Sequence, residues 1–170
     1  IPYRSWYDVL PSLPHGDEAT VEELRHAYRV PREIMDFSLP LLSVIAPGLE
    51  PSIAYRTGAE PPLVRRVAEH ELLREAYREA ERLARGDGIV ALIVADELVE
   101  PALQEESALE GMPLLTARDA KGLEFDHVIV VEPALVAARE QGLRELYVAL
   151  TRPTQTLVVV HALPLPPPLA

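Results

Sequence analysis

The stretch Gly88–Ala95, with the sequence GIVALIVA, decides the fold class. It is apolar throughout, rich in β-branched residues and too short for a buried helix, so it predicts a strand. Because its apolar residues do not alternate with polar ones, both faces of this strand are expected to be covered, as in a parallel sheet. His127–Val131 and Thr156–Val160 have the same character. The sequence therefore predicts several buried strands in one sheet.

Helical patterns lie between these strands. The clearest is Leu63–Arg85, where apolar residues recur every four positions and opposite charges lie three or four apart on the expected solvent side, before Gly86 as the expected C-cap. Further helices are expected at Glu97–Leu109 and Gly142–Leu150, and a strand at Pro113–Ala117. Helices that alternate with buried strands predict an α/β fold, a mainly parallel sheet flanked by helices.

The first third of the chain has weaker signals. Thr20 is expected to N-cap a helix that ends before Pro31, which then begins a second helix. This second helix is expected to reach about Ala46, with a kink at Pro40. A short strand is expected at Ser52–Thr57.

A chain of 170 residues suits one domain with one substantial core. We assign residues 1–161 to this domain and residues 162–170 to a Pro-rich tail, which we expect to be extended and disordered. The first residue is Ile1 rather than Met, and we expect the chain to be part of a longer protein.

The charge balance of 27 acidic against 16 basic residues gives a net charge of −11. This weighs against an autonomous basic nucleic-acid module, although an acidic domain can still borrow a basic partner domain. The absence of cysteine excludes disulfides and thiolate chemistry. The longest uncharged run, Phe37–Leu49, is well short of the ~20 residues of a membrane span, and no signal peptide is recognisable. We therefore expect a cytoplasmic protein without a membrane partner.

Three segments contain candidate functional residues: Tyr28 with Arg29, the stretch TARDAKGLEFD at Thr116–Asp126, and GLRELYVALTRP at Gly142–Pro153. In the second, the only lysine of the chain precedes a glycine in a loop near strand ends, where open α/β sheets bind ligands. In the third, Arg152 stands at a helix-to-strand junction, from which an arginine can reach a neighbouring phosphate. Taken singly these signals are weak, because a surface arginine at a helix end is usually solvated or paired.

As an ordered set, the segments resemble a known family. AKGLEFD followed by LYVALTRP resembles the fifth and sixth motifs of superfamily 1 helicase-like ATPases of the UvrD/Rep type, and Ala27–Arg29 (AYR) resembles the fourth. The resemblance is closer still to the HelD group of actinobacteria, which associates with RNA polymerase. It extends over SWYDVL, AYRVPREIMDF, GIVALIVAD, KGLEFDHVIVVEP and GLRELYVALTRPTQTLVVVH, which cover essentially the whole chain.

This resemblance implies a RecA-like domain, with a fold of the P-loop NTPase type, that is the second motor domain of a two-domain ATPase. ATP with Mg would bind between it and an upstream RecA-like domain, which would supply the metal ligands. The implied catalytic residues are Arg29 and Arg152, both directed to the γ-phosphate. Glu124 and Gly122 would contact the ribose side of the nucleotide, and Lys121 would stiffen or contact the same loop.

The resemblance also implies that Thr116 and Arg118 face a nucleic-acid strand and that Tyr147 packs the motif helix. The departures from the family pattern matter here. Arg118 stands where the DNA helicases usually have histidine, and Asp119 adds a negative charge beside the expected strand path. No GxxxxGKS or GxxxxGKT loop is present in the 170 residues, so the chain alone is not expected to hydrolyse ATP.

Three functions stay open at this point. The first is a half-motor that remodels RNA polymerase, the second is a DNA helicase or repair translocase acting on single strands, and the third is a non-catalytic interaction domain. For the first two, the Arg152→Ala variant is expected to lose most ATPase activity. It is expected to fold nearly normally, because a charged residue at a helix end contributes little to the core.

Overall fold

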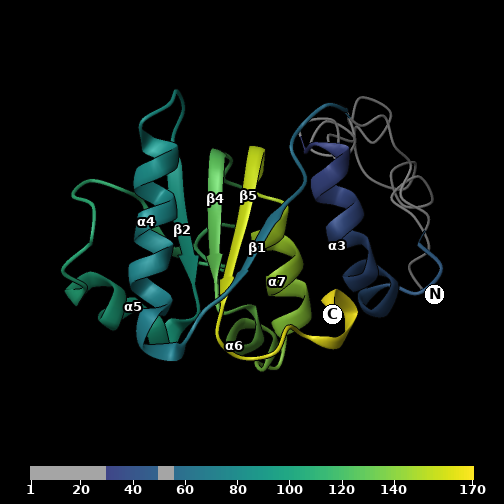
Figure 1. Cartoon of the computed structure of the whole chain (residues 1–170). Coiled ribbons are helices and arrows are strands. Elements are labelled where there is room, and N and C mark those ends of the chain that lie inside the picture. The colour runs from purple at the N-terminus through teal and green to yellow at the C-terminus, as the bar shows by residue number, and fades with distance from the viewer. Residues whose placement is uncertain (1–29, 50–55) are drawn as a thin grey trace, which may run out of the picture.

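Five parallel strands form the sheet at the centre of the molecule (Figure 1). The computed structural model describes residues 30–49 and 56–170. Within these residues the strands follow the order β1-β5-β4-β2-β3 across the sheet. The strands are β1 (Leu63–Arg66), β2 (Val90–Val94), β3 (Leu114–Thr116), β4 (Phe125–Val131) and β5 (Pro153–His161).

The three strands predicted from apolar runs lie at the centre of the sheet. Every residue of β2 is buried, and its Leu92 is aligned with Ile129 of β4, which is aligned with Val158 of β5. The side chains of successive residues point to opposite faces, so an unbroken apolar run is what a strand covered on both faces requires. The predicted parallel α/β architecture is therefore confirmed.

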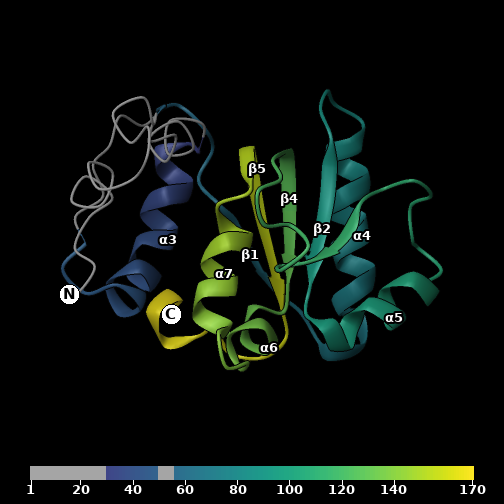
Figure 2. The same ribbon diagram turned by 180° about the vertical axis from the view of Figure 1, so that it is seen from behind.

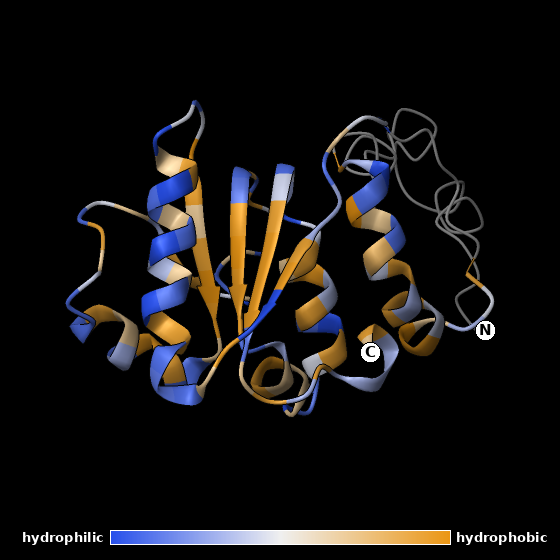
Figure 3. Cartoon of the chain, in the orientation of Figure 1, coloured by the Kyte–Doolittle hydropathy of each residue, from blue (hydrophilic) through white to orange (hydrophobic). Residues whose placement is uncertain are grey.

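Helices cover both faces of the sheet (Figures 1 and 2). One face packs against α3 (Arg32–Ile45), α6 (Pro133–Ala137) and α7 (Gly142–Leu150), and the other against α4 (Leu72–Ala84) and α5 (Asp96–Gln104). Strand β4 shows the division, because Val128 and Val130 belong to the first core cluster and Ile129 and Val131 to the second. Figure 3 shows the same pattern, with the central strands hydrophobic and α4 polar on its outer side.

The predicted single helix at Leu63–Arg85 is wrong in its first third. Leu63–Arg66 is strand β1, which pairs with β5, and a short 3-10 turn, η2 (Glu69–Glu71), precedes helix α4. The spacing of the apolar residues does not distinguish a helix from a strand here. A repeat of four residues fits one face of a helix, and because four is an even number it also fits one face of a strand. Pairing with β5 decides between the two.

The charged face of α4 is also not wholly on the solvent side. Four pairs of opposite charge three or four apart are expected here. Glu75–Arg78, Glu79–Arg82 and Glu81–Arg85 form, whereas the described residues Glu71 and Arg74 do not pair with each other. However, Glu79 is only 3% exposed, and its carboxylate lies 2.8 Å from both Arg65 Nε of β1 and Arg82 Nε. A residue expected to be solvated is therefore a buried link between α4 and the edge strand.

Helix α3 follows the prediction closely, since Pro31 immediately precedes it and Pro40 lies inside it. The end of the chain does not follow its prediction. Residues Pro167–Leu169 form a 3-10 turn, η3, and Leu165 and Leu169 pack against the core cluster that includes α3. Prolines restrict the unfolded chain, so ordering this segment costs less entropy than its composition suggested.

Two predictions of the first third of the chain lie outside the described residues: the helix from Thr20, and most of the strand at Ser52–Thr57. The described end of that segment pairs with the start of α3, where the Arg32 N–H donates to the Arg56 carbonyl at 2.9 Å. In the part of the chain that the structure describes, no helix is long and apolar enough to cross a membrane.

Candidate functional site

The connection from β3 to β4, residues 117–124, joins opposite edges of the sheet. Thr116 ends β3 level with Val94 and Val131, at the carboxyl edge of the strands. Phe125 begins β4 opposite Pro153, at the amino edge. Between them, Ala117 and Ala120 are buried in the core cluster that includes α7. The segment TARDAKGLEFD therefore begins at the carboxyl edge of the sheet and ends at the amino edge.

At the amino edge, the side chain of Arg152 joins three segments. Its Nε donates to the Val148 carbonyl at 2.9 Å, its Nη1 to the Leu123 carbonyl at 3.3 Å, and its Nη2 to the Thr151 hydroxyl at 3.3 Å. The Arg152 carbonyl in turn accepts from the Phe125 N–H at 3.2 Å. The end of α7, the start of β5 and the end of the loop are therefore fixed to one another.

Thr151 determines where α7 ends, and so where Arg152 lies. The Thr151 hydroxyl donates to the Tyr147 carbonyl at 2.8 Å, which satisfies one of the last carbonyls of α7. The helix ends there, and the next residues enter β5. Tyr147 is partly buried against the core cluster, as expected for a residue that packs the motif helix.

Burial and charge act in opposite directions on this arginine. Burial lowers the pKa of Arg152, while the nearby Glu124 and Tyr147 raise it. Burial also raises the pKa of Tyr147. Because an arginine guanidinium keeps its proton in proteins, the site keeps a fixed positive charge.

The loop beside Arg152 is open to the outside. Lys121, Gly122 and Leu123 are exposed, and Gly122 has a φ of +79°, which a glycine adopts without strain. A Cβ at Gly122 would meet nothing within 4 Å, so the backbone conformation, not space, favours glycine there. Leu123, which the sequence did not single out, is 45% exposed and adds an apolar side chain next to Glu124 and Arg152.

The structure therefore brings Leu123 and Glu124 next to Arg152 at the amino edge. Lys121 and Gly122 precede them in the same loop, where the Lys121 N–H donates to the Arg118 carbonyl at 3.3 Å. The amino edge offers charged and hydrogen-bonding groups, and the exposed backbone of the loop follows directly on them in sequence. Arg29, the other predicted catalytic residue, lies outside the described residues.

Thr116 and Arg118 lie at the opposite, carboxyl edge and are engaged by acidic side chains. The Thr116 hydroxyl donates to the Asp119 carboxylate at 2.8 Å, and Arg118 Nη2 donates to Asp96 Oδ2 at 2.6 Å. Arg139 also binds the Asp96 carboxylate, and its hydrogen bond is the main reason that the pKa of Asp96 is lowered.

The sequence analysis missed Asp96 and Arg139. A signal for the first was present, since Asp96 directly follows the buried run GIVALIVA and so had to lie at the carboxyl edge of the sheet. The partner of Asp96 could not be read in this way, because Arg118 and Arg139 approach it from two other connections. Among the described residues, no group of three or more His, Asp or Glu side chains could hold a metal ion.

Comparison with known proteins gives a matching family model and a similar solved structure that bear on the fold. Residues 113–160 match the family model of the UvrD-like helicase C-terminal domain, a range that includes both the loop and Arg152. No curated protein matches the chain. Among solved structures, the chain is similar to the C-terminal domain of a possible DNA helicase from Lactobacillus plantarum WCFS1. The two share 24% identity over 85% of this chain and 92% of that one, with a TM-score of 0.62, so they have the same fold.

Proposed function

We propose that the chain is the second RecA-like motor domain of a UvrD-type, helicase-like ATPase and completes an ATP site between itself and an upstream domain. The observation that carries this proposal is the contact between Arg152 and the carbonyl of Leu123, which holds the arginine beside the exposed Lys121–Glu124 loop. The match of residues 113–160 to the helicase family model supports it.

The donors of Arg152 fit an anionic ligand. A guanidinium carries five N–H donors. The hydrogen bonds to Val148, Leu123 and Thr151 use one donor on each nitrogen, so each terminal nitrogen keeps one N–H for a phosphate oxygen. A group held in this way is pre-organised, because no reorganisation is needed when negative charge develops beside it.

In this proposal, Arg152 and Arg29 stabilise the charge of the γ-phosphate, Gly122 and Glu124 contact the ribose side, and Lys121 steadies the same loop. ATP supplies the phosphoanhydride bond, and the upstream domain supplies the phosphate loop and the ligands of Mg. The 170 residues contain no such loop, so ATP hydrolysis belongs to the longer protein.

We propose that this motor acts on RNA polymerase rather than on DNA. The residues that would face a nucleic-acid strand, Thr116 and Arg118, are already bound by Asp119 and Asp96. A phosphate would have to displace these carboxylates. The alternative is a DNA helicase or translocase acting on single strands in repair, favoured by the helicase descriptions of the matching family model and of the similar solved structure.

The ATPase rate of the longer protein tests the proposal, measured alone, with single-stranded DNA and with RNA polymerase. Stimulation by polymerase and indifference to DNA would support polymerase remodelling. Strong stimulation by DNA would support the helicase alternative. A longer protein without any phosphate loop would overturn both and leave a non-catalytic interaction domain. The 170-residue chain alone is the control, and we expect it to be inactive.

A further inference from the structure

Strand β1 is an edge of the sheet with an open side. Only β5 pairs with it among the described residues, and the Val67 N–H donates to the His161 carbonyl at 2.9 Å. Backbone groups of a strand point alternately to either side, so Val64 and Arg66 direct their N–H and C=O groups away from β5. An open edge of this kind can pair with an added strand.

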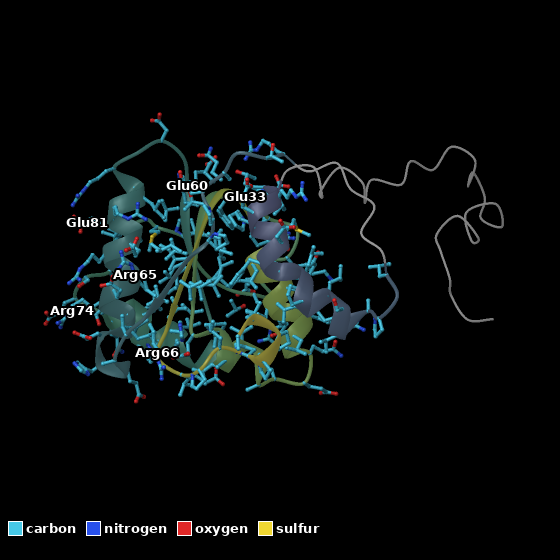
Figure 4. All side chains as sticks on the ribbon, turned by 45° about the vertical axis from the view of Figure 1, so that its right-hand side comes forward. Glu33, Glu60, Arg65, Arg66, Arg74 and Glu81 are labelled. Carbon is cyan, nitrogen blue, oxygen red and sulfur yellow. The ribbon has the colours of Figure 1, made fainter. Side chains whose placement is uncertain are left out.

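A groove of about 520 Å³ runs between β1 and α4 beside this open edge. Its charged lining is mostly basic and comprises Arg65, Arg66, Arg74, Arg78, Glu71 and Glu75. In Figure 4, Arg65 and Arg66 of β1 and Arg74 of α4 lie on the same side of the molecule. A basic groove is unusual on a chain whose net charge is −11.

The arginines of this groove differ in their partners. Arg65 binds Glu79 and Glu75, and Arg78 binds Glu75. The side chains of Arg66 and Arg74 are exposed and form no ion pair or hydrogen bond with any residue that the structure describes. The side chains of Arg66 and Arg74 are therefore available to bind a ligand. They lie beside a strand edge whose outward backbone groups are unpaired among the described residues.

We infer that β1 accepts an extended, acidic segment of a partner protein as a sixth strand. Its backbone would pair with Val64 and Arg66, and its carboxylates would bind the side chains of Arg66 and Arg74. Val64, which is 38% exposed, adds an apolar contact at the same edge. We choose an acidic segment because its negative charge is complementary to the arginines of the groove.

Other occupants fit less well. In a second copy of the chain paired through β1, Arg65 and Arg66 would lie against their own counterparts, and like charges directly opposite each other destabilise a sheet. A nucleic-acid strand could satisfy the arginines but has no backbone amides with which to extend the ladder.

A short synthetic peptide that is rich in valine and carries glutamate at both odd and even positions, labelled with fluorescein, tests this inference by anisotropy with the 170-residue chain. Glutamates on both faces are needed because Arg66 and Arg65 point to opposite faces of the sheet, and Arg65 is the one that reaches α4, the helix of Arg74. The R66E/R74E double variant is expected to lower its affinity at least about tenfold, and V64P to lower it as well. Proline at Val64 removes an N–H on the open side only, so the pairing with β5 is kept. The control R144E reverses an exposed charge on α7, across the sheet, and is expected to change nothing.

Two altered peptides separate backbone pairing from simple attraction of charge. A peptide with lysine in place of glutamate, and one with alternate backbone amides methylated, are both expected to bind at least about tenfold more weakly. Equal binding of the methylated peptide would overturn strand addition. Failure of the valine–glutamate peptide to bind, stronger binding of single-stranded DNA at this edge, or dimerisation through β1 would each overturn the inference. Circular dichroism of each variant confirms that it is folded.

Discussion

A single guanidinium, that of Arg152, does more in this fold than its place at a helix end suggested. The sequence led us to expect that its removal would leave folding nearly intact. In the structure it donates to two backbone carbonyls, of Val148 and Leu123, in a partly buried position. Unpaired carbonyls in such a place cost free energy, so the structure favours a measurable loss of stability when this guanidinium is removed.

We therefore predict two separate losses for Arg152→Ala. The free energy of unfolding of the 170-residue chain should fall by about 1–2 kcal/mol, measured by urea denaturation. The ATPase rate of the longer protein should fall by roughly 10³- to 10⁵-fold. Arg144→Ala is the control, because Arg144 is exposed on the same helix, and should change neither. A stability loss with only a few-fold loss of activity would make Arg152 structural alone.

Glu79 is the second residue whose environment the sequence did not reveal. Its side chain is 4% exposed and is bound by Arg65 and Arg82, each about half exposed. Glu79→Gln should lower the free energy of unfolding by about 1–3 kcal/mol, because it removes the charge that both arginines bind and leaves Arg65 with the more distant Glu75, at 3.6 Å.

The matched control for Glu79 is Glu81→Gln on the same helix. Glu81 is 58% exposed and pairs with Arg85 at 3.4 Å, so its loss should cost less than about 0.5 kcal/mol. Equal effects of the two substitutions in urea denaturation would show that burial of the Glu79 carboxylate does not matter.

In the connections between secondary-structure elements, glycine is required at two positions, Gly142 and Gly122, for different reasons. A Cβ at Gly142, the first residue of α7, would lie 2.3 Å from the Ala137 carbonyl oxygen at the end of α6. Gly122 has open space but a φ of +79°. The first is required by a close approach of two helices and the second by backbone conformation.

Alanine substitutions should separate these two causes. Gly142→Ala should lower the free energy of unfolding by about 2–3 kcal/mol, because α6 and α7 must move apart. Gly122→Ala should cost only about 1 kcal/mol. The midpoints of urea denaturation measure both, and the reverse order would contradict the described packing of α6 on α7.

The sequence predicted the elements whose signals are local. The buried strands β2, β4 and β5 and the helix Gly142–Leu150 lie where their apolar patterns placed them. It failed where a distant partner decides the structure: β1 exists because β5 pairs with it, and the last leucines are ordered because α3 covers them. At the site, the proximity of Arg152 to the loop was expected from the family resemblance, whereas the engagement of Arg118 by Asp96 depended on side chains far apart in sequence.

The whole molecule keeps two sets of polar groups at opposite edges of one sheet. Leu123, Glu124 and Arg152 are at the amino edge, and Thr116 and Arg118 are at the carboxyl edge. The loop between them passes under α7 through the buried Ala117 and Ala120. This packed connection and strand β4 both run from one edge to the other, so either can carry the effect of a ligand between them.

Net charge and local pairing together predict weak binding of single-stranded DNA by the 170-residue chain. The chain carries −11, and Asp96 and Asp119 engage the groups that would meet phosphates. The D96A/D119A variant frees Arg118 and should bind DNA more tightly, with a slope of log affinity against log salt steeper by at least about 0.7. The control D36A/E81A removes two acidic charges and frees Arg32 and Arg85 elsewhere, and it should show a smaller gain. Tight, strongly salt-dependent binding by the unaltered chain, measured by anisotropy, would instead show that the carboxylates do not block this edge.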